Sequence, residues 1–423
     1  MIKLLKLLKG DMEPKNSVLI ISILLGFLTQ FFIGPVLVWN IWVLAIEATF
    51  NSSRTEVSLP FFLVALLLSF AGTIMGFIVK KLGTHKSLSL SLLLMGIGLI
   101  LSSYSRSSQE IAIFFGLIYG VGVSIGSLSS LTLGSMLSKN RGTVTGIIAT
   151  GITIGMISMV GLHEIINNWR SEFLTVGIFT LIAGIATTLY SRSYYGRYGE
   201  KLISSKDDAQ RFIEVKPIQI LRKPSFYLLW ISYTFAFPLG VFASVHLIPL
   251  ITKTMTNSTF NVAFSVILFA LSNMTGRLFT GRMIDVVGSL WIYVLHMLST
   301  LGSLILLLTS MLNDTLQVAL LLVGVIVTGL SYGGFVVSLP LTTRRFFGRN
   351  FLFVNYGILN TSFGFASLPG STIAGYVYDI TKSYSMVLII YLVLSIASAV
   401  FFKLASLQNR HEKSKKIMKN KIT

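Results

Sequence analysis

The chain has 423 residues, of which 53% are hydrophobic and 12% are charged, and its mean hydropathy is +0.79. Because soluble domains carry about 25% charged residues, this composition excludes an ordinary soluble globular protein. The sequence contains no cysteine, which excludes a disulfide framework and a thiolate metal site, and it carries a net charge of +19.

Twelve apolar segments follow one another along the chain. A helix needs about 20 apolar residues to cross the hydrocarbon core, and lipid offers no water to unpaired backbone groups, so such segments must be helical. The first segment is too long for the core of a signal peptide, and we expect it to be retained. The sequence predicts an all-α membrane protein with twelve transmembrane helices, at 17–46, 57–79, 87–105, 110–137, 142–163, 170–190, 225–252, 259–283, 289–310, 314–340, 350–377 and 384–406.

The basic residues are distributed unequally between the two sides of the predicted membrane. One side carries both termini and most of the 34 Lys and Arg residues, while the other has only Arg54, Arg106, Arg170, Lys253 and Lys382. Cytoplasmic loops are enriched in Lys and Arg, so we expect both termini in the cytoplasm of a multi-pass protein of the cell membrane. This distribution explains the net charge without a nucleic-acid partner.

The predicted helices fall into two sets of six, separated by the polar stretch 191–224. The predicted organisation is a basic N-terminal arm (1–16), an N-terminal bundle (17–190), a cytoplasmic linker (191–224), a C-terminal bundle (225–406) and a basic tail (407–423). The arm either lies on the inner leaflet or is a solvated segment that sets topology.

The two sets share a loop pattern, Gly-x3-charged-x2-Gly. It follows the second helix as Gly76, Lys80 and Gly83, and the eighth helix as Gly281, Asp285 and Gly288, an offset of 205 residues from Gly76 to Gly281. The repeat predicts two pseudo-symmetric six-helix bundles, with these loops as candidate gating elements. Glycines in the fifth helix, among them Gly151 and Gly155, favour close helix packing, which is compatible with static packing and with sliding.

The Gly281–Gly288 loop, the repeated halves and the linker resemble the major facilitator superfamily. The stretches Val245–Pro249, Asn273–Gly281 and Asn355–Gly357 resemble its branch of oxalate/formate antiporters and monocarboxylate transporters. The resemblance implies alternating access between two bundles, around a cavity lined mainly by helices 1, 4, 7 and 10. Lys80 departs from the pattern, because the superfamily usually has Asp there to help latch the cytoplasmic gate.

Arg277 is the one clear basic residue inside a predicted helix. An ionised side chain at a helix centre costs about 2.5–3.5 kcal/mol on insertion scales, so it requires a reason. One interpretation is an anchor for a substrate carboxylate, whose two oxygens match the guanidinium fork. The other is a side chain that snorkels to the cytoplasmic interface.

The resemblance favours the anchor, because the helix 8 arginine of both related families binds the carboxylate and Arg277 aligns with it. Asn273 lies one turn earlier, where monocarboxylate carriers have Asp. Phe363 stands where the oxalate carrier has a second cation, and one cation suits a monoanion better than a dianion.

Further polar and aromatic residues are candidates for the cavity. Tyr119 and Tyr332 resemble aromatic cavity residues of the oxalate carrier, and Gln30 and Asn360 are candidate polar contacts; each is alternatively a core or lipid-facing residue. His246 is a candidate proton-binding or gating residue because imidazole titrates near neutral pH, and its alternative is a hydrogen-bonded structural histidine.

The sequence predicts a secondary active transporter, working as a monomer, for a small organic anion such as a monocarboxylate. Antiport and proton-linked symport both remain open. The alternative is efflux of amphipathic compounds, with Arg277 structural. The predicted helices supply no cysteine and no deep acidic residue, so we expect no enzyme activity, no cofactor and no metal site.

Overall fold

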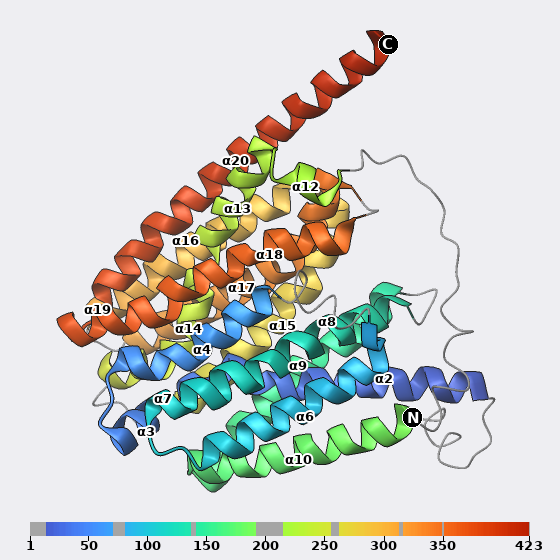
Figure 1. The fold of residues 1–423 in the computed structure, drawn as a ribbon. Coiled ribbons are helices and arrows are strands. Elements are labelled where there is room, and N and C mark those ends of the chain that lie inside the picture. The colour runs from blue at the N-terminus through green and yellow to red at the C-terminus, as the bar shows by residue number, and fades with distance from the viewer. Residues whose placement is uncertain are drawn as a thin grey trace. The chain divides into compact units, whose positions relative to one another are not determined.

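The computed structural model describes residues 14–70, 81–136, 141–191, 215–254, 262–312, 316–348 and 351–422, and these residues form helices without a strand. They group into two compact units, one formed by described residues within 14–37 and 81–191 and the other by described residues within 38–70 and 215–422. Each unit has its own helix packing (Figure 1).

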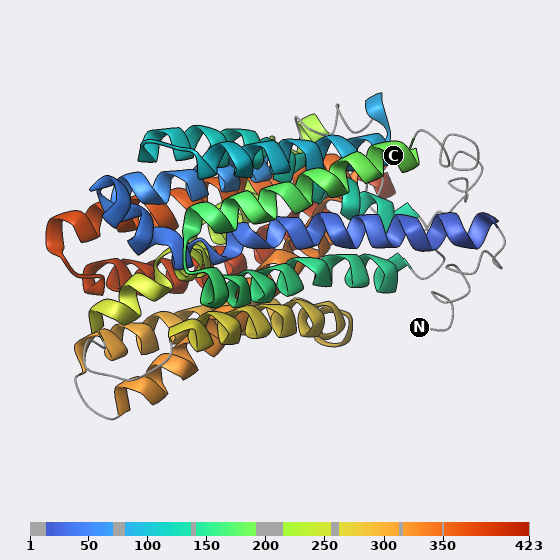
Figure 2. The ribbon, with the colours of Figure 1, turned by 90° about the horizontal axis from the view of Figure 1, so that it is seen from below.

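The first unit is a bundle of long helices. Its closest packed pairs are α10 with α6, α2 with α9, and α6 with α8, and Figure 2 shows the blue helix α2 running alongside α9. The elements are α2 (Pro14–Ile33), η1 (Gly34–Val38), α6 (Thr84–Ser103), α7 (Ser108–Ile111), η3 (Ala112–Tyr119), α8 (Gly120–Met136), α9 (Arg141–Ile166) and α10 (Trp169–Tyr190), with the last residue of η1 grouped in the second unit.

The second unit combines two helices from early in the chain with the helices of the C-terminal half. In Figure 1, α4 lies beside α18, and contacts join α3 to α14 and α4 to α18, η6 and α19. The elements are α3 (Asn40–Phe50), α4 (Arg54–Ser69), α12 (Pro217–Ile220), α13 (Pro224–Ala236), α14 (Pro238–Thr254), α15 (Val262–Val287), α16 (Leu290–Met311), α17 (Leu316–Phe347), α18 (Leu352–Leu368), η6 (Pro369–Ile373), α19 (Ala374–Thr381) and α20 (Ser385–Ile422).

The predicted all-α membrane architecture is confirmed. Every one of the twelve predicted spans contains a described helix, and ten helices of the described residues are long and apolar enough to cross a membrane. Along α10, large apolar side chains such as Phe179, Ile182 and Leu189 are exposed, as expected for a surface in contact with lipid.

Several predicted spans are divided into two or more helical segments. The first is interrupted at η1, the seventh between α13 and α14, and the eleventh at η6. Proline lacks the amide donor and clashes with the preceding turn, and Pro35, Pro238 and Pro369 lie at these three interruptions.

The repeated loop pattern has a common backbone feature in both units. Gly83 has a φ of 79° and Gly288 a φ of 65°, a left-handed conformation that glycine adopts without steric cost. The last glycine of the pattern is therefore required by the backbone at both places. Gly76 and Lys80 lie outside the described residues, as does the side chain of Asp285.

Candidate functional site

Arg277 lies on α15, one helical turn after Asn273. The Nε of Arg277 donates a hydrogen bond of 2.8 Å to Oδ1 of Asn273. Tyr332 on α17 and Tyr356 on α18 belong to the wider surroundings of Arg277. Within the described parts of the chain, no carboxylate forms an ion pair with Arg277.

The two faces of α15 have different surroundings. Val266, Ala270 and Asn273 are buried, whereas Leu278 and Phe279 on the other side are exposed apolar residues. Arg277 is half-buried and follows Asn273 by four residues, which places both on the same face of the helix. The charge is thus directed away from the exposed apolar face.

Close approach of α17 explains why Asn273 is buried. A methyl group at Gly333 would collide with the carbonyl oxygen of Asn273, so only glycine allows this backbone contact. Asn273 is fully buried and its Nδ2 has no hydrogen-bond partner among the described residues. An unused buried donor costs about 1–3 kcal/mol, which a ligand oxygen can recover.

Aromatic residues surround Phe237, at the junction of α13 and α14. The ring of Phe237 lies 6.2 Å from Tyr332 and 5.2 Å from Phe363, both edge-on. The structure therefore brings Tyr332 and Phe363 into one aromatic cluster in the second unit. Phe363 contributes an apolar surface there and no second cation.

The remaining candidate cavity residues make internal hydrogen bonds. In the first unit, Gln30 donates from Nε2 to Ser130 Oγ (2.8 Å), and Tyr119 donates from its hydroxyl to Phe32 O (2.9 Å). In the second unit, Asn360 donates from Nδ2 to the carbonyl oxygen of Ser69 (3.4 Å). A role for Gln30, Tyr119 or Asn360 in substrate binding stays a prediction.

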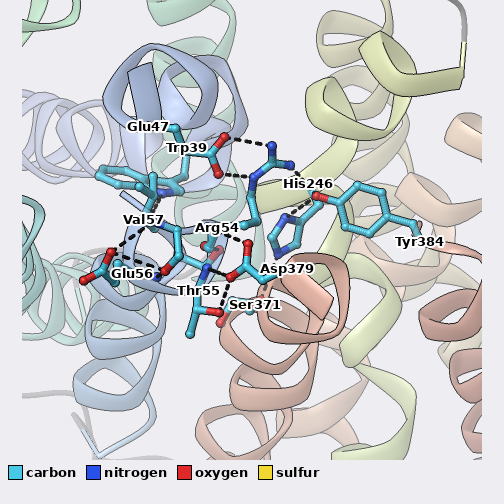
Figure 3. Close-up of polar contacts among 12 residues, drawn as sticks. Trp39, Glu47, Arg54, Thr55, Glu56, Val57, His246, Ser371, Asp379 and Tyr384 are labelled. Carbon is cyan, nitrogen blue, oxygen red and sulfur yellow. Dashed lines mark hydrogen bonds and ion pairs between the residues drawn. The ribbon is translucent and has the colours of Figure 1, made fainter. Parts of the chain in front are cut away.

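A second polar centre, here called the Arg54 cluster, consists of Glu47, Arg54, His246, Asp379 and Tyr384 (Figure 3). The guanidinium of Arg54 forms a two-pronged ion pair with Glu47, in which Nε bonds Oε1 and Nη2 lies 2.8 Å from Oε2. Its Nη1 donates to the hydroxyl oxygen of Tyr384 at 2.5 Å. Burial disfavours the charged form of Arg54, but the hydrogen bond and charge of Glu47 outweigh it and raise the pKa of Arg54 above its ordinary value.

Asp379 holds the beginning of α4. Its carboxylate accepts hydrogen bonds from the backbone nitrogens of Arg54 (3.0 Å) and Thr55 (2.9 Å), and from the hydroxyl of Thr55 (2.6 Å). These donors are unsatisfied at any helix start, where a negative charge is also favoured. A side chain 325 residues away in sequence therefore caps α4.

His246 is fully buried and uses both ring nitrogens. Nε2 lies 2.8 Å from the carbonyl oxygen of Ser371 and must donate, because a carbonyl only accepts. Nδ1 lies 3.1 Å from the hydroxyl of Tyr384 and, in the neutral ring, accepts a hydrogen bond from it. His246 is thus a member of the Arg54 cluster, and the role in proton binding or gating stays a prediction.

Sequence reasoning did not identify the Arg54 cluster. The sequence places Arg54 among the basic residues of the outer side and gives no reason to pair it with another residue. Asp379 and Tyr384 are more than 300 residues from Arg54, and no spacing pattern connects such distant positions. The available signal is the occurrence of single charges at the predicted outer ends of several helices.

The comparisons with known proteins agree with this architecture. A family model described as Major Facilitator Superfamily matches residues 19–351 and 255–422. Monocarboxylate transporter 2 of Mus musculus is 23% identical over 400 residues, covering 88% of this chain and 82% of the relative. The proton-coupled antiporter flippase LtaA of Staphylococcus saprophyticus is 22% identical over 395 residues, covering 92% and 95%.

Among solved structures, the crystal structure of the nucleoside transporter NupG superimposes with a TM-score of 0.68 at 14% identity, covering 91% of this chain and 99% of that one. This likeness shows a shared fold. The resemblance found in the sequence, including its monocarboxylate-transporter branch, is confirmed, and the relatives are transporters and not enzymes. The chain belongs to the major facilitator superfamily of membrane transporters.

Proposed function

We propose that this protein moves a small organic anion, specifically a monocarboxylate, across the cell membrane by alternating access. Arg277 carries the proposal. It is a half-buried cation, oriented by Asn273 through Nε, without an acidic partner in the described structure. Its one hydrogen bond among the described residues is through Nε, so the two terminal nitrogens are available for a ligand there.

The chemistry of the surroundings favours a carboxylate with one charge. The two terminal nitrogens match the two oxygens of a carboxylate, and the interaction is stronger in a low-dielectric site than in water. Tyr332 and Tyr356 are neutral residues in the wider surroundings of Arg277, while Phe363 adds an apolar surface and no charge. Relatives named as monocarboxylate transporters support the same substrate class.

We infer that both termini lie in the cytoplasm, because basic residues concentrate on their side of the membrane. We propose that the transporter works as a monomer.

Substrate binding stabilises a conformation in which the anion neutralises Arg277, and the two six-helix halves rock around it. Antiport and proton-linked symport both fit this scheme. An imposed pH gradient that drives uptake supports symport, and uptake that persists without the gradient supports exchange.

A second candidate function is the efflux of amphipathic compounds, with Arg277 in a structural role. One observation favours it: a relative that covers 92% of this chain is named as a proton-coupled antiporter flippase. In that case the aromatic cluster around Phe237 contacts an apolar part of the substrate.

A thermal-shift screen of the purified protein against small carboxylates tests the proposal. A ligand at 100 times its Kd adds about 2.7 kcal/mol of stability, so a binder raises the Tm measurably. We expect stabilisation by one or more monocarboxylates in the wild type and none in Arg277→Ala. Arg410→Ala, at an exposed arginine of α20 outside the candidate gating loops, is the control and keeps the shift. Equal stabilisation of wild type and Arg277→Ala would remove the anchor.

A further inference from the structure

The helix α4 is held along its whole length by the segment α18–η6–α19. Asp379 caps its first turn, and Asn360 donates to Ser69 O at its last residue. Between these ends the backbones approach closely: a methyl group at Gly375 would lie 2.9 Å from Arg54 O and 3.0 Å from Thr55 N. The contact is therefore specific in both packing and hydrogen bonding.

The Arg54 cluster joins four further parts of the second unit to α4. Glu47 comes from α3, His246 from α14, Asp379 from α19, and Tyr384 directly precedes α20. The guanidinium of Arg54 also lies 4.5 Å above the ring of Tyr378, which stacks on Tyr384. The Arg54 side chain thus bonds Glu47 on α3 and reaches Tyr378 and Tyr384 in the second half of the sequence, and Tyr384 extends the cluster to His246 on α14.

The hydrogen bonds of the cluster follow one direction. Arg54 donates to Tyr384, Tyr384 donates to Nδ1 of His246, and His246 donates from Nε2 to Ser371. Every one of these groups is satisfied while the elements stay together. Breaking a buried pair on one side is costly because it leaves an uncompensated charge, whereas full exposure to water restores the solvation of every group. Such a cluster favours two states, closed or fully opened.

We propose that the Arg54 cluster is a latch that holds α3 and α4 against α14, α19 and α20 and that opens in the transport cycle. A transporter of this family must expose its substrate to both sides in turn. The latch lies at the ends of helices on the side that the sequence predicts to be extracellular. Its closed form seals that side. The inference is independent of Arg277 and of the identity of the substrate.

The absence of native cysteine allows a direct test. Ser58 is fully buried on α4 one turn after Arg54, so Ser58→Cys reports exposure of the latched face. Ser91 is fully buried in the first unit, so Ser91→Cys is the matched control. The rate of labelling by a membrane-impermeant maleimide is measured for each reporter, alone and combined with Tyr384→Phe or Asp379→Asn.

Both latch variants nearly retain the size of the side chain. Tyr384→Phe removes the hydroxyl that bonds Arg54 and His246, and Asp379→Asn removes the negative charge and one of the two oxygens that accept hydrogen bonds from α4. Loss of a hydrogen bond to a charged group shifts the equilibrium between the closed and the opened latch by about tenfold. We therefore expect Ser58→Cys to be labelled about ten times faster in the latch variants, and Ser91→Cys to be labelled at an unchanged rate. An unchanged Ser58→Cys rate in both variants would overturn the latch. A parallel increase at Ser91→Cys would also overturn it, because the cluster would then stabilise the whole fold and not a single contact.

Discussion

Asn273 determines which nitrogens of Arg277 are available to a ligand. Its Oδ1 accepts from Nε at 2.8 Å, and as a neutral amide it orients the guanidinium without cancelling the charge. An ionised carboxylate at this position would orient the guanidinium and also cancel its charge. The choice of amide or acid at one residue therefore sets the charge of the site.

Asn273→Asp tests this role. When ionised, the new carboxylate would pair with Arg277 and repel an incoming carboxylate, and like-charge juxtaposition costs several kcal/mol, so we expect at least about tenfold weaker binding of the stabilising monocarboxylate at neutral pH. Because protonation of the Asp removes the repulsion, the affinity should recover as the pH falls, which is consistent with carriers that have Asp at this position. Calorimetric titration measures the Kd. Asn273→Ser retains an uncharged hydrogen-bonding side chain and should lose less affinity. Equal Kd values for Asn273→Asp and the wild type would show that the ligand does not bind near Arg277.

At this scale the sequence singled out part of the arrangement, and its role in substrate binding stays a prediction. Arg277 is conspicuous as a charge within an apolar segment, Asn273 lies one turn away, and the structure joins the two by a hydrogen bond. The Arg54 cluster was missed because its members lie at helix ends, where charges are common, and only the folded chain brings Asp379 and Tyr384 to Arg54. The fully bonded state of His246 was likewise not predictable, since Ser371 and Tyr384 belong to distant segments.

At the scale of elements, glycines determine how closely the helices pack. Gly155 on α9 faces α2, and a methyl group there would collide with the carbonyl oxygen of Phe31. Gly161 lies on the same helix and has open space around its Cα. The same substitution at the two positions therefore separates packing from helix propensity.

We predict that Gly155→Ala destabilises the protein by about 1–3 kcal/mol, because backbone atoms cannot move aside as a flexible side chain would. Gly161→Ala should be neutral or slightly stabilising, since alanine favours the helix by up to about 1 kcal/mol. Thermal unfolding in detergent measures both. Similar Tm values for the two variants would mean that α2 and α9 are not in close contact.

The apolar segments predicted the positions of the helices but not their interruptions. Hydropathy measures length and composition, so the first and seventh spans looked continuous. The backbone breaks near Pro35 and Pro238 depend on a lost amide donor and on local packing, which hydropathy does not record. The continuation of α17 to Phe347 was also missed, because its last turns carry Arg344 and Arg345.

At the scale of the whole molecule, the charge asymmetry predicts how the chain is oriented in the membrane. Ala48 is exposed near the end of α3, and Ser414 lies in the basic tail. An impermeant maleimide applied to intact cells should label Ala48→Cys and leave Ser414→Cys unlabelled until the cells are broken. Labelling of Ser414→Cys in intact cells, with Ala48→Cys protected, would show that the chain has the opposite orientation to the one predicted.

The exchange of a monocarboxylate across a reconstituted membrane tests the central claim most directly. Lipid vesicles containing the protein are loaded with a carboxylate that stabilises it, and the uptake of the labelled compound is followed. Removing one partner of a buried charge pair costs about 2–5 kcal/mol, so we expect Arg277→Ala to lose about 30-fold or more of the exchange rate. Arg410→Ala should exchange as the wild type does. Wild-type exchange by Arg277→Ala would contradict the account, because the anion would then be bound without this guanidinium.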